Sequence, residues 1–276
     1  MSSEGKPFDP RRYKAQERAG FNRIADRYGA NAQMRESLAR SLLHAADLAP
    51  GQAVLDLASG PGLLARHALE AVGPTGWVLA SDLAEGMLHS AQADTPGLGA
   101  CGADAEQLPF APATFDRVLM GLGLFVCPHP QQVLLEIRRT LRPGGRVALS
   151  VWGPPEQVPL ITCAQDCLSR IVGPARAARP SVFRLGGPGV MARMLAEAGF
   201  RAIQVQDHPL RCDFADAAQY WQAFLDLAGG VTEALAKLPE ETRLALARAV
   251  EADLLPYRSE SGFRLPAQTL IATAQA

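Results

Sequence analysis

The sequence predicts an α/β protein with a doubly wound sheet and helices on both faces. Two observations lead to this prediction. Between residues 50 and 152, apolar stretches of strand length alternate with amphipathic stretches of helix length, and small or acidic residues stand where the strands end. Strands joined by crossover helices form parallel sheets covered on both sides. The chain has 276 residues and is 48% hydrophobic, so a large core is easily built.

Residues 1–49 are predicted to form a helical N-terminal cap. Apolar residues recur at helical spacing within residues 17–29 and again within residues 34–48. The stretch GANA, residues 29–32, interrupts the pattern, so we expect two helices with a break between them.

Residues 50–152 are predicted to form the ligand-binding core. Gly73 closes the first helix of this region, and the RPGG stretch at residues 142–145 stops the last one. We expect strands at 54–57, 76–82, 98–104, 115–121 and 146–152, and helices at 62–73, 84–93 and 130–141.

Residues 153–276 complete the predicted fold with a less regular rhythm. Two segments, around 153–182 and 213–262, are too long for tight loops, and we expect them to form a lid over the ligand edge of the sheet. We expect one helix in the first segment, a helix at 188–200, strands at 201–214 and 263–276, and helices at 215–230 and 240–257.

Composition limits the classes of partner. The formal net charge is −1, without the basic excess that nucleic-acid binding favours. The N-terminus is polar, and no apolar run approaches the roughly 20 residues of a membrane span. We therefore expect a cytoplasmic protein with a small-molecule substrate, no nucleic-acid partner and no membrane span. Of the five cysteines, Cys163 and Cys167 lie one helical turn apart, but no second pair or histidine cluster accompanies them, so no metal site is predicted.

The stretch VLDLASGPG, residues 54–62, predicts a strand followed by a loop that is almost free of side chains. Such a loop lets a ligand approach the backbone, and the helix that follows offers unpaired N–H groups. A dinucleotide fingerprint does not fit, because Ala58 and Leu63 occupy the positions of its first and last glycines. A phosphate-binding P-loop does not fit either, since no Gly-Lys-Ser/Thr follows. A tight turn without a ligand is the alternative.

Acidic residues at the ends of the next two strands favour a nucleoside ligand. Asp82 can accept hydrogen bonds from both hydroxyls of a ribose. Asp104 can accept one from an exocyclic amine such as the adenine N6, and the Ala105 N–H can reach a ring nitrogen. Leu83 and Met87 are placed to sandwich a flat base.

Taken together, the motifs resemble those of class I S-adenosylmethionine-dependent methyltransferases. The resemblance is to the subgroup that includes the ubiquinone/menaquinone C-methyltransferases and many small-molecule methyltransferases. It covers residues 50–152 and extends more weakly to FNRIADRYG (21–29) and LAEAGF (195–200). The motifs in order are VLDLASGPG (54–62), VLASDLAEGML (78–88), CGADAEQLPF (101–110), FDRVLM (115–120) and LRPGGRVALSVWG (141–153).

The resemblance implies a Rossmann-like, seven-stranded mixed sheet whose last strand is antiparallel, with S-adenosyl-L-methionine bound at the strand ends. It also implies roles for residues. Asp56 would support the loop, Asp82 would bind the ribose, and Met120 would lie near the sulfonium and the acceptor. The remaining implied residues are Ala58, Ser59, Gly60 and Gly62 along the methionine part, Tyr28 over it, Leu83 and Met87 against the adenine, and Asp104 and Ala105 at the adenine edge.

The function that follows is methyl transfer to an O or C atom of a small, hydrophobic or aromatic acceptor. Two alternatives stay open: a non-methylating reaction on the same scaffold (decarboxylation, cyclisation or hydroxylation), or a non-enzymatic cofactor-binding partner. The sequence identifies no catalytic residue. His129 is the strongest histidine candidate for a base, with Tyr13, Tyr28 and Glu17 as others, and a homodimer is an open alternative. Aromatic residues available to an acceptor pocket, or simply to the packing of the lid helices, are Phe125, Trp152, Phe183, Phe214, Tyr220, Trp221 and Phe224.

Overall fold

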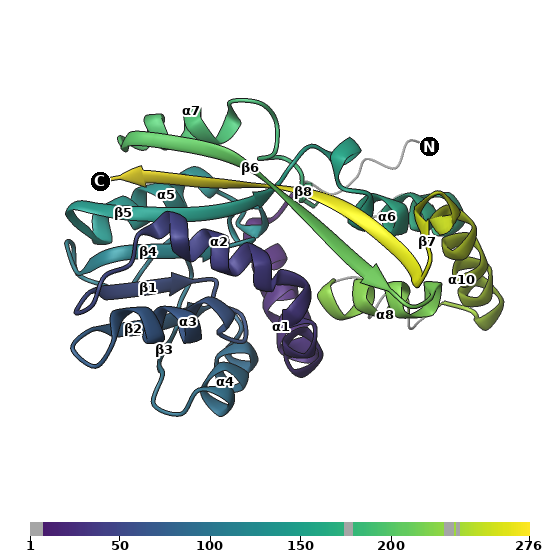
Figure 1. Cartoon of the computed structure of the whole chain (residues 1–276), viewed down its shortest axis with the longest axis horizontal. Helices are drawn as coiled ribbons and strands as arrows, with labels where there is room; N and C mark the ends of the chain where they lie inside the picture. The colour runs from purple at the N-terminus through teal and green to yellow at the C-terminus, as the bar shows by residue number, and fades with distance from the viewer. Residues whose placement is uncertain (1–7, 174–178, 229–234, 236–237) are drawn as a thin grey trace.

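One mixed β-sheet organises the computed structural model (Figure 1), which describes residues 8–173, 179–228, 235 and 238–276. Parts of the predicted cap and lid, residues 1–7, 174–178, 229–234 and 236–237, lie outside the described residues. The strands are β1 (Ala53–Leu57), β2 (Trp77–Asp82), β3 (Gly99–Gly102), β4 (Phe115–Gly121), β5 (Leu141–Trp152), β6 (Arg201–Phe214), β7 (Arg258–Ser259) and β8 (Gly262–Gln275).

The strand order is β3-β2-β1-β4-β5-β8-β6, with the two-residue β7 paired to β8. Strands β1 to β5 are parallel, and β8 runs antiparallel to both β5 and β6. The predicted doubly wound mixed sheet with an antiparallel last strand is therefore confirmed, and β7 adds an eighth strand to the seven predicted. Strand order reverses between β1 and β4, the point at which such sheets bind ligands.

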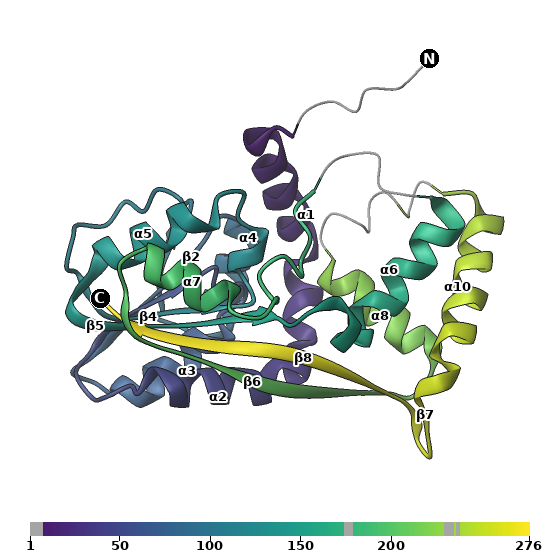
Figure 2. The ribbon, with the colours of Figure 1, turned by 90° about the horizontal axis from the view of Figure 1, so that it is seen from above.

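Helices cover both faces of the sheet (Figure 2), with α2 and α3 on one side and α5 and α7 on the other. β1 is buried along its whole length, so its side chains serve both layers: Val54 packs with the α2–α3 layer, and Leu55 and Leu57 pack with the α5–α7 layer. The helices of these layers are α2 (Glu36–Ala46), α3 (Leu63–Val72), α4 (Glu85–Asp94), α5 (Pro130–Thr140) and α7 (Val190–Glu197).

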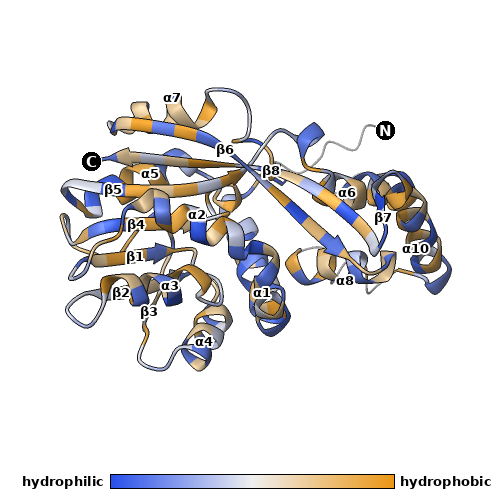
Figure 3. Cartoon of the chain, viewed as in Figure 1, coloured by the Kyte–Doolittle hydropathy of each residue, from blue (hydrophilic) through white to orange (hydrophobic). Residues whose placement is uncertain are grey.

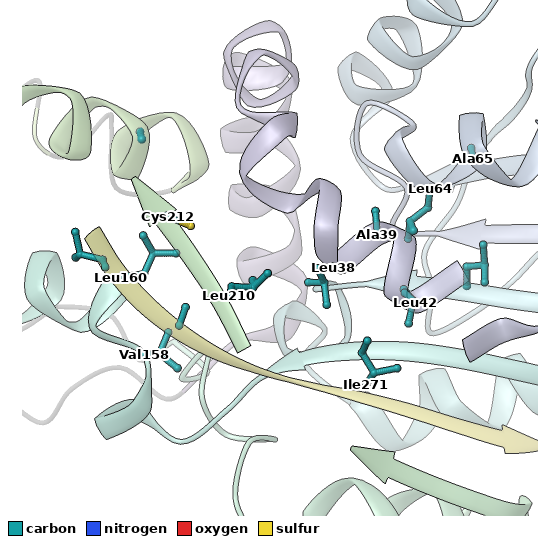
Figure 4. Packing of buried hydrophobic residues seen from close by; sticks show 14 of the residues in the cluster. Leu38, Ala39, Leu42, Leu64, Ala65, Val158, Leu160, Leu210, Cys212 and Ile271 are labelled. Carbon is teal, nitrogen blue, oxygen red and sulfur yellow. The ribbon is translucent and has the colours of Figure 1, made fainter. Parts of the chain in front are cut away.

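The central strands are apolar along most of their length (Figure 3), as expected for a sheet buried on both faces. Figure 4 shows Leu38 and Leu42 of α2 beside Leu64 of α3, with Ile271 of β8 nearby. This cluster fixes α2 and α3 against the sheet and so positions the loop between β1 and α3. Within the described residues, no helix is long and apolar enough to cross a membrane.

Two predicted boundaries differ from the structure. Helix α1 (Pro10–Ala30) begins seven residues before the predicted start, because the Asp9 side chain caps it by accepting from the amides of Arg11 and Arg12. The predicted break follows, as the short 3₁₀ helix η1 (Ala32–Arg35). Strand β5 also begins earlier than predicted: Leu141 already pairs with Phe115, and the pairing shifts before resuming at Arg146, with Gly144 at a φ of +76°.

Three helices form a cluster beyond the sheet: α6 (Pro159–Val172), α8 (Ala217–Leu227) and α10 (Glu240–Leu254). Strands β6 and β8 extend beyond the rest of the sheet and stay paired as far as Phe214 and Phe263. The helical cluster lies at this extended end (Figures 1 and 2). At its centre the buried Tyr220 hydroxyl accepts from the Ala164 amide at 3.1 Å and donates to the Leu160 carbonyl at 3.0 Å. Phe214 packs edge-on against the Tyr220 ring. Both aromatic residues therefore bury the predicted lid helices, as the alternative stated, and neither lines an acceptor pocket.

We expect the turn that connects β7 to β8 to depend on Gly262. Its φ is +130°, and a Cβ atom there would lie 2.1 Å from the Phe214 carbonyl oxygen. Gly262→Ala should lower the free energy of unfolding, measured by urea denaturation, by more than Gly144→Ala. Gly144 also has a positive φ, but nothing lies within 4 Å of its Cβ position, so only the ~1–2 kcal/mol of left-handed strain applies. Equal losses in the two variants would show that the contact with Phe214 is unimportant.

Candidate active site

A cavity lies between helix α1 and the carboxyl ends of β1 to β4. It encloses about 830 Å³, part of it open to solvent. We call it the first cavity. Eight of the residues predicted for the ligand site line it: Tyr28, Ala58, Gly60, Asp82, Leu83, Met87, Asp104 and Ala105. Further lining residues, which the sequence analysis did not assign to the ligand, are Lys14, Arg18, Phe21, Leu57, Ala84, Ala103, Gly121, Leu122, Gly123, Val126, Cys127 and Pro128, together with Tyr13 and Glu17, named there only as candidate bases.

The loop after β1 presents bare backbone to the first cavity at Gly60. A Cβ atom at this position would point to the Tyr28 ring, 3.7 Å from its Cε1, across the cavity. Gly62 has a different role, since its Cβ would lie 2.9 Å from the Cβ of Ala91 on α4. Gly62 therefore allows close packing of the loop against α4 rather than approach of a ligand. Ala58 and Gly60 both take a φ of +54°.

Asp82 holds two loops together. Its Oδ2 accepts from the Gly60 amide and its Oδ1 from the Ala84 amide, each at 2.9 Å. Burial raises the pKa of Asp82, although these backbone amides oppose the effect. A carboxylate has about four acceptor positions. The amides of Gly60 and Ala84 occupy two of these positions, the Leu83 amide also favours the ionised form, and the side chain lines the first cavity.

Asp56 lies beneath the same loop and is completely buried. Among the described residues, neither of its oxygens has a hydrogen-bond partner. The Ala65 amide lies near the carboxylate and lowers its pKa, which opposes the effect of burial, but it does not reach hydrogen-bond geometry. Burial, with a smaller contribution from the charge of Asp82, raises the pKa of Asp56 to about 8. The side chain lines neither cavity, and its predicted support of the loop stays a prediction.

The Asp104 end of the first cavity is held by a residue that the sequence analysis missed. Lys14 of α1 donates to Asp104 at 2.7 Å and to Glu106 at 2.6 Å. Although burial opposes it, these hydrogen bonds raise the pKa of Lys14. Asp104 Oδ1 also accepts from the Glu106 amide at 3.0 Å. About ninety residues separate Lys14 from these partners, and no local pattern marks such a pairing.

Helix α1 is joined to α4 by further polar contacts. Arg18 pairs with Glu85, and the Asn22 side chain accepts from the Gly86 amide at 2.7 Å. The predicted N-terminal cap therefore forms one wall of the first cavity and meets the strand ends through polar side chains.

Besides Asp56 and Gly62, three further sequence-predicted residues do not line the first cavity. His129 pairs with Glu106 at 2.9 Å and has a side chain that is 60% exposed, so the structure gives it no place at the cavity. Met120 is completely buried in the core, because β4 is covered on both faces at this point. Met120 is not a lining residue of either cavity, but a Cβ atom on Gly123, which lines the first cavity, would lie 3.0 Å from its Cε; its predicted place near the sulfonium and the acceptor stays a prediction. The backbone that follows it, Gly121 to Gly123, lines the cavity instead. Ser59 lines a neighbouring cavity.

The neighbouring cavity encloses about 490 Å³ and lies between α2, α3 and the loop after β1. We call it the second cavity. The two cavities meet at shared residues: Tyr28, Ala58, Gly60, Gly121 and Leu122. The walls of the second cavity are mainly apolar side chains of α2 and α3, with Arg35 at one side. The aromatic residues Trp221 and Phe224 stack on each other in the helical cluster and are not lining residues of either cavity.

Residues 55–149 match the family model of a methyltransferase domain. The ubiquinone/menaquinone biosynthesis C-methyltransferase of Ralstonia nicotianae is 39% identical over 116 residues, which are 39% of this chain and 48% of that enzyme. The predicted resemblance to class I S-adenosylmethionine-dependent methyltransferases is confirmed for this part of the chain. The matched segments span between about half and somewhat under two thirds of the curated relatives' length.

Solved structures share the fold over most of the chain. Haemonchus contortus phosphoethanolamine N-methyltransferase 2, in complex with phosphomonomethylethanolamine and S-adenosylhomocysteine, has a TM-score of 0.57 and 18% identity. The alignment covers 92% of this chain and 59% of that one. The [4+2]-cyclase SpnF has a TM-score of 0.55 and 17% identity, covering 87% of this chain and 80% of that one. At these identities the likeness shows a common fold and leaves the reaction undecided.

Asp56 makes a prediction about stability and pH. Its folded-state pKa lies above the value of about 4 expected in the unfolded chain. Its contribution to stability is therefore complete below about pH 4 and is lost as the pH rises towards about 8. In urea unfolding, the wild type should lose stability relative to Asp56→Asn when the pH is raised from about 5.5 to about 7.5.

Asp116→Asn is the matched control. Although burial opposes it, the Ala53 amide and Arg142 hold the pKa of Asp116 below its ordinary value, so this residue stays ionised throughout that range. The stability difference between wild type and Asp116→Asn should not change with pH there. A constant difference between wild type and Asp56→Asn as well would disprove the raised pKa of Asp56.

Proposed function

We propose that this chain binds S-adenosylmethionine in the first cavity and transfers its methyl group to an O or C atom of a small organic acceptor. The observation that carries the proposal is that three features line one cavity: the backbone of Gly60, the Asp82 carboxylate and the Asp104 carboxylate. The methyltransferase-domain match over residues 55–149 supports the same cofactor.

The residues present fit the cofactor. The Asp82 carboxylate lines the cavity and has two oxygens, which suit the two adjacent hydroxyls of a ribose. Leu83 and Met87 offer apolar surface beside it for a flat base, and Asp104 offers an acceptor for an exocyclic amine. Gly60 presents backbone without a side chain where the two cavities meet beside Tyr28, and the amino-acid end would pass along it.

The cofactor supplies a methyl group already activated on a sulfonium, so the protein's own task is to bind, orient and exclude water. Helix α1 and the strand ends perform this task by enclosing the first cavity. At the Gly121–Gly123 backbone the lining becomes apolar, with Leu122 and Val126. This lining and the quinone-pathway names of the relatives favour a hydrophobic or aromatic acceptor. The predicted role of the segments 153–182 and 213–262 as a lid stays a prediction, because none of their described residues lines either cavity.

The assay that tests the reaction follows the methyl group itself. Candidate quinone-like and phenolic acceptors are incubated with the protein and the cofactor labelled in its methyl group. The proposal predicts labelled acceptor together with S-adenosylhomocysteine. A transformed acceptor without either product would favour the non-methylating alternative on this scaffold.

Loss of the Asp82 carboxylate should weaken cofactor binding. Asp82→Asn should lower the affinity for S-adenosylhomocysteine in calorimetry by roughly 1.5–3 kcal/mol, the scale of hydrogen bonds to a charged group. Asp94→Asn, at the exposed end of α4, is the control and should bind as the wild type does. Unchanged affinity in Asp82→Asn would contradict the ribose assignment.

A side chain at Gly60 should exclude the cofactor. Gly60→Val would place its methyl groups between the loop and Tyr28, and binding of S-adenosylhomocysteine should be lost. Gly144→Val is the control, because Gly144 also has a positive φ, of +76°, and nothing within 4 Å of its Cβ position. The control should suffer left-handed backbone strain of the same kind and still bind. Binding retained by Gly60→Val would sink the placement of the cofactor along this loop.

A further inference from the structure

Glu17 of α1 brings a third carboxylate to the first cavity. Among the described residues that line this cavity, the other carboxylates are Asp82 and Asp104, and the proposed function assigns both to the cofactor. The Oε1 atom of Glu17 accepts from the Arg179 side chain. Within the described part of the chain, no hydrogen bond occupies its Oε2 atom. Glu17 is therefore a lining carboxylate that the cofactor assignment leaves unused.

The burial of Glu17 exceeds what an ion pair on α1 requires. The next pair along this helix, Arg18 with Glu85, has side chains that are 51% and 44% exposed. The Glu17 side chain is only 12% exposed. A buried carboxylate loses its hydration, and a single ion pair recovers only part of that loss. A ligand group that donates to the second oxygen would recover more of it.

Tyr13 stands four residues before Glu17, so the two side chains are neighbours on one face of α1. We call these two residues the polar pair. Tyr13 is 7% exposed and also lines the first cavity. Burial raises the pKa of its hydroxyl, although the charges of Arg179 and Arg184 oppose the effect, so the hydroxyl stays protonated and can donate. The polar pair therefore offers one acceptor and one donor, which together match a hydroxyl group.

The polar pair is linked to the loop after β4. The charge of Arg184 acts on Tyr13, and the same guanidinium donates to the carbonyls of Cys127 and Pro128. These two residues follow Val126, where the lining of the first cavity is apolar. Apolar walls with a few polar groups are typical of sites for small organic molecules. The polar pair and the apolar lining together suit a hydroxyl group carried on an aromatic ring.

We propose that the polar pair binds a hydroxyl group of the methyl acceptor, with Glu17 accepting from its O–H and Tyr13 donating to its oxygen. The inference rests on the proposed function and narrows its acceptor to a hydroxylated aromatic molecule, such as a phenol or a hydroquinone. A ribose hydroxyl of the cofactor is the other source of the same chemistry, and the test distinguishes the two.

Two probes of nearly equal shape test the proposal by calorimetry on the protein saturated with S-adenosylhomocysteine. 2-Naphthol carries a hydroxyl group where 2-methylnaphthalene carries a methyl group. The wild type should bind 2-naphthol roughly ten- to a hundredfold more tightly, the scale of a hydrogen bond to a charged group. Glu17→Gln should reduce this preference about tenfold, because it removes the charge and keeps the shape. Tyr13→Phe should reduce it about threefold, as expected for a neutral hydrogen bond.

Binding of 2-methylnaphthalene and of S-adenosylhomocysteine should change less than about threefold in Glu17→Gln, which also shows that the variant is folded. Glu197→Gln is the matched control. Glu197 also pairs with an arginine, Arg193 at 3.9 Å, but its side chain is 59% exposed on α7 and lines neither cavity. This control should leave the affinities for both probes unchanged.

Three results would overturn the proposal. Weakened binding of S-adenosylhomocysteine in Glu17→Gln would assign the hydroxyl group to the ribose of the cofactor. Equal weakening of the two probes by Glu17→Gln would show that Glu17 merely holds Arg179. A wild type that binds both probes equally, or binds neither, would show that the cavity does not recognise a hydroxyl group. Failure of the wild type to bind S-adenosylhomocysteine would instead refute the proposed function.

Discussion

The Asp82 carboxylate is the constraint on which the rest of the candidate site depends. By accepting from Gly60 and from Ala84, it joins the loop after β1 to the start of α4. Burial favours the neutral form of this carboxylate, and the two amides offset part of that effect by hydrogen bonding to the ionised form. The same bonds fix the orientation of the carboxylate, which lines the first cavity. The Asp82 side chain therefore joins these two segments and is also the proposed binding group.

The floor and the wall of the first cavity are built from different interactions. The floor consists of strand ends and the Gly60 loop, fixed by two buried apolar layers and by the close contact of Gly62 with α4. The wall, α1, meets the floor through polar side chains, Lys14 with Asp104 and Glu106, and through a small buried apolar cluster in which Ile24 and Ala25 pack with Ala84 and Met87. This cluster is much smaller than the two apolar layers that fix the floor, and partly exposed ion pairs add little to it. We therefore expect α1, rather than the sheet edge, to move when a ligand enters.

Site residues that stand at the ends of strands could be predicted from the sequence, whereas contacts between residues far apart in the sequence could not. Gly60 and Asp82 could be found because each stands at the end of its own strand, and parallel strands bring those ends to one edge. Lys14 could not, since its partners lie about ninety residues away. The complete burial of Met120 could not be predicted either, because alternation along a strand does not reveal that both faces are covered. Phe214 and Tyr220 were compatible with a pocket or a core, and only the packing of the helical cluster decided between them.

A crystal structure of the protein with S-adenosylhomocysteine is the most direct test of the account. The account predicts the two ribose hydroxyls within hydrogen-bond distance of the Asp82 oxygens, and the base between Leu83, Met87 and Asp104. A ligand bound elsewhere, or one in the first cavity whose ribose makes no contact with Asp82, would contradict it.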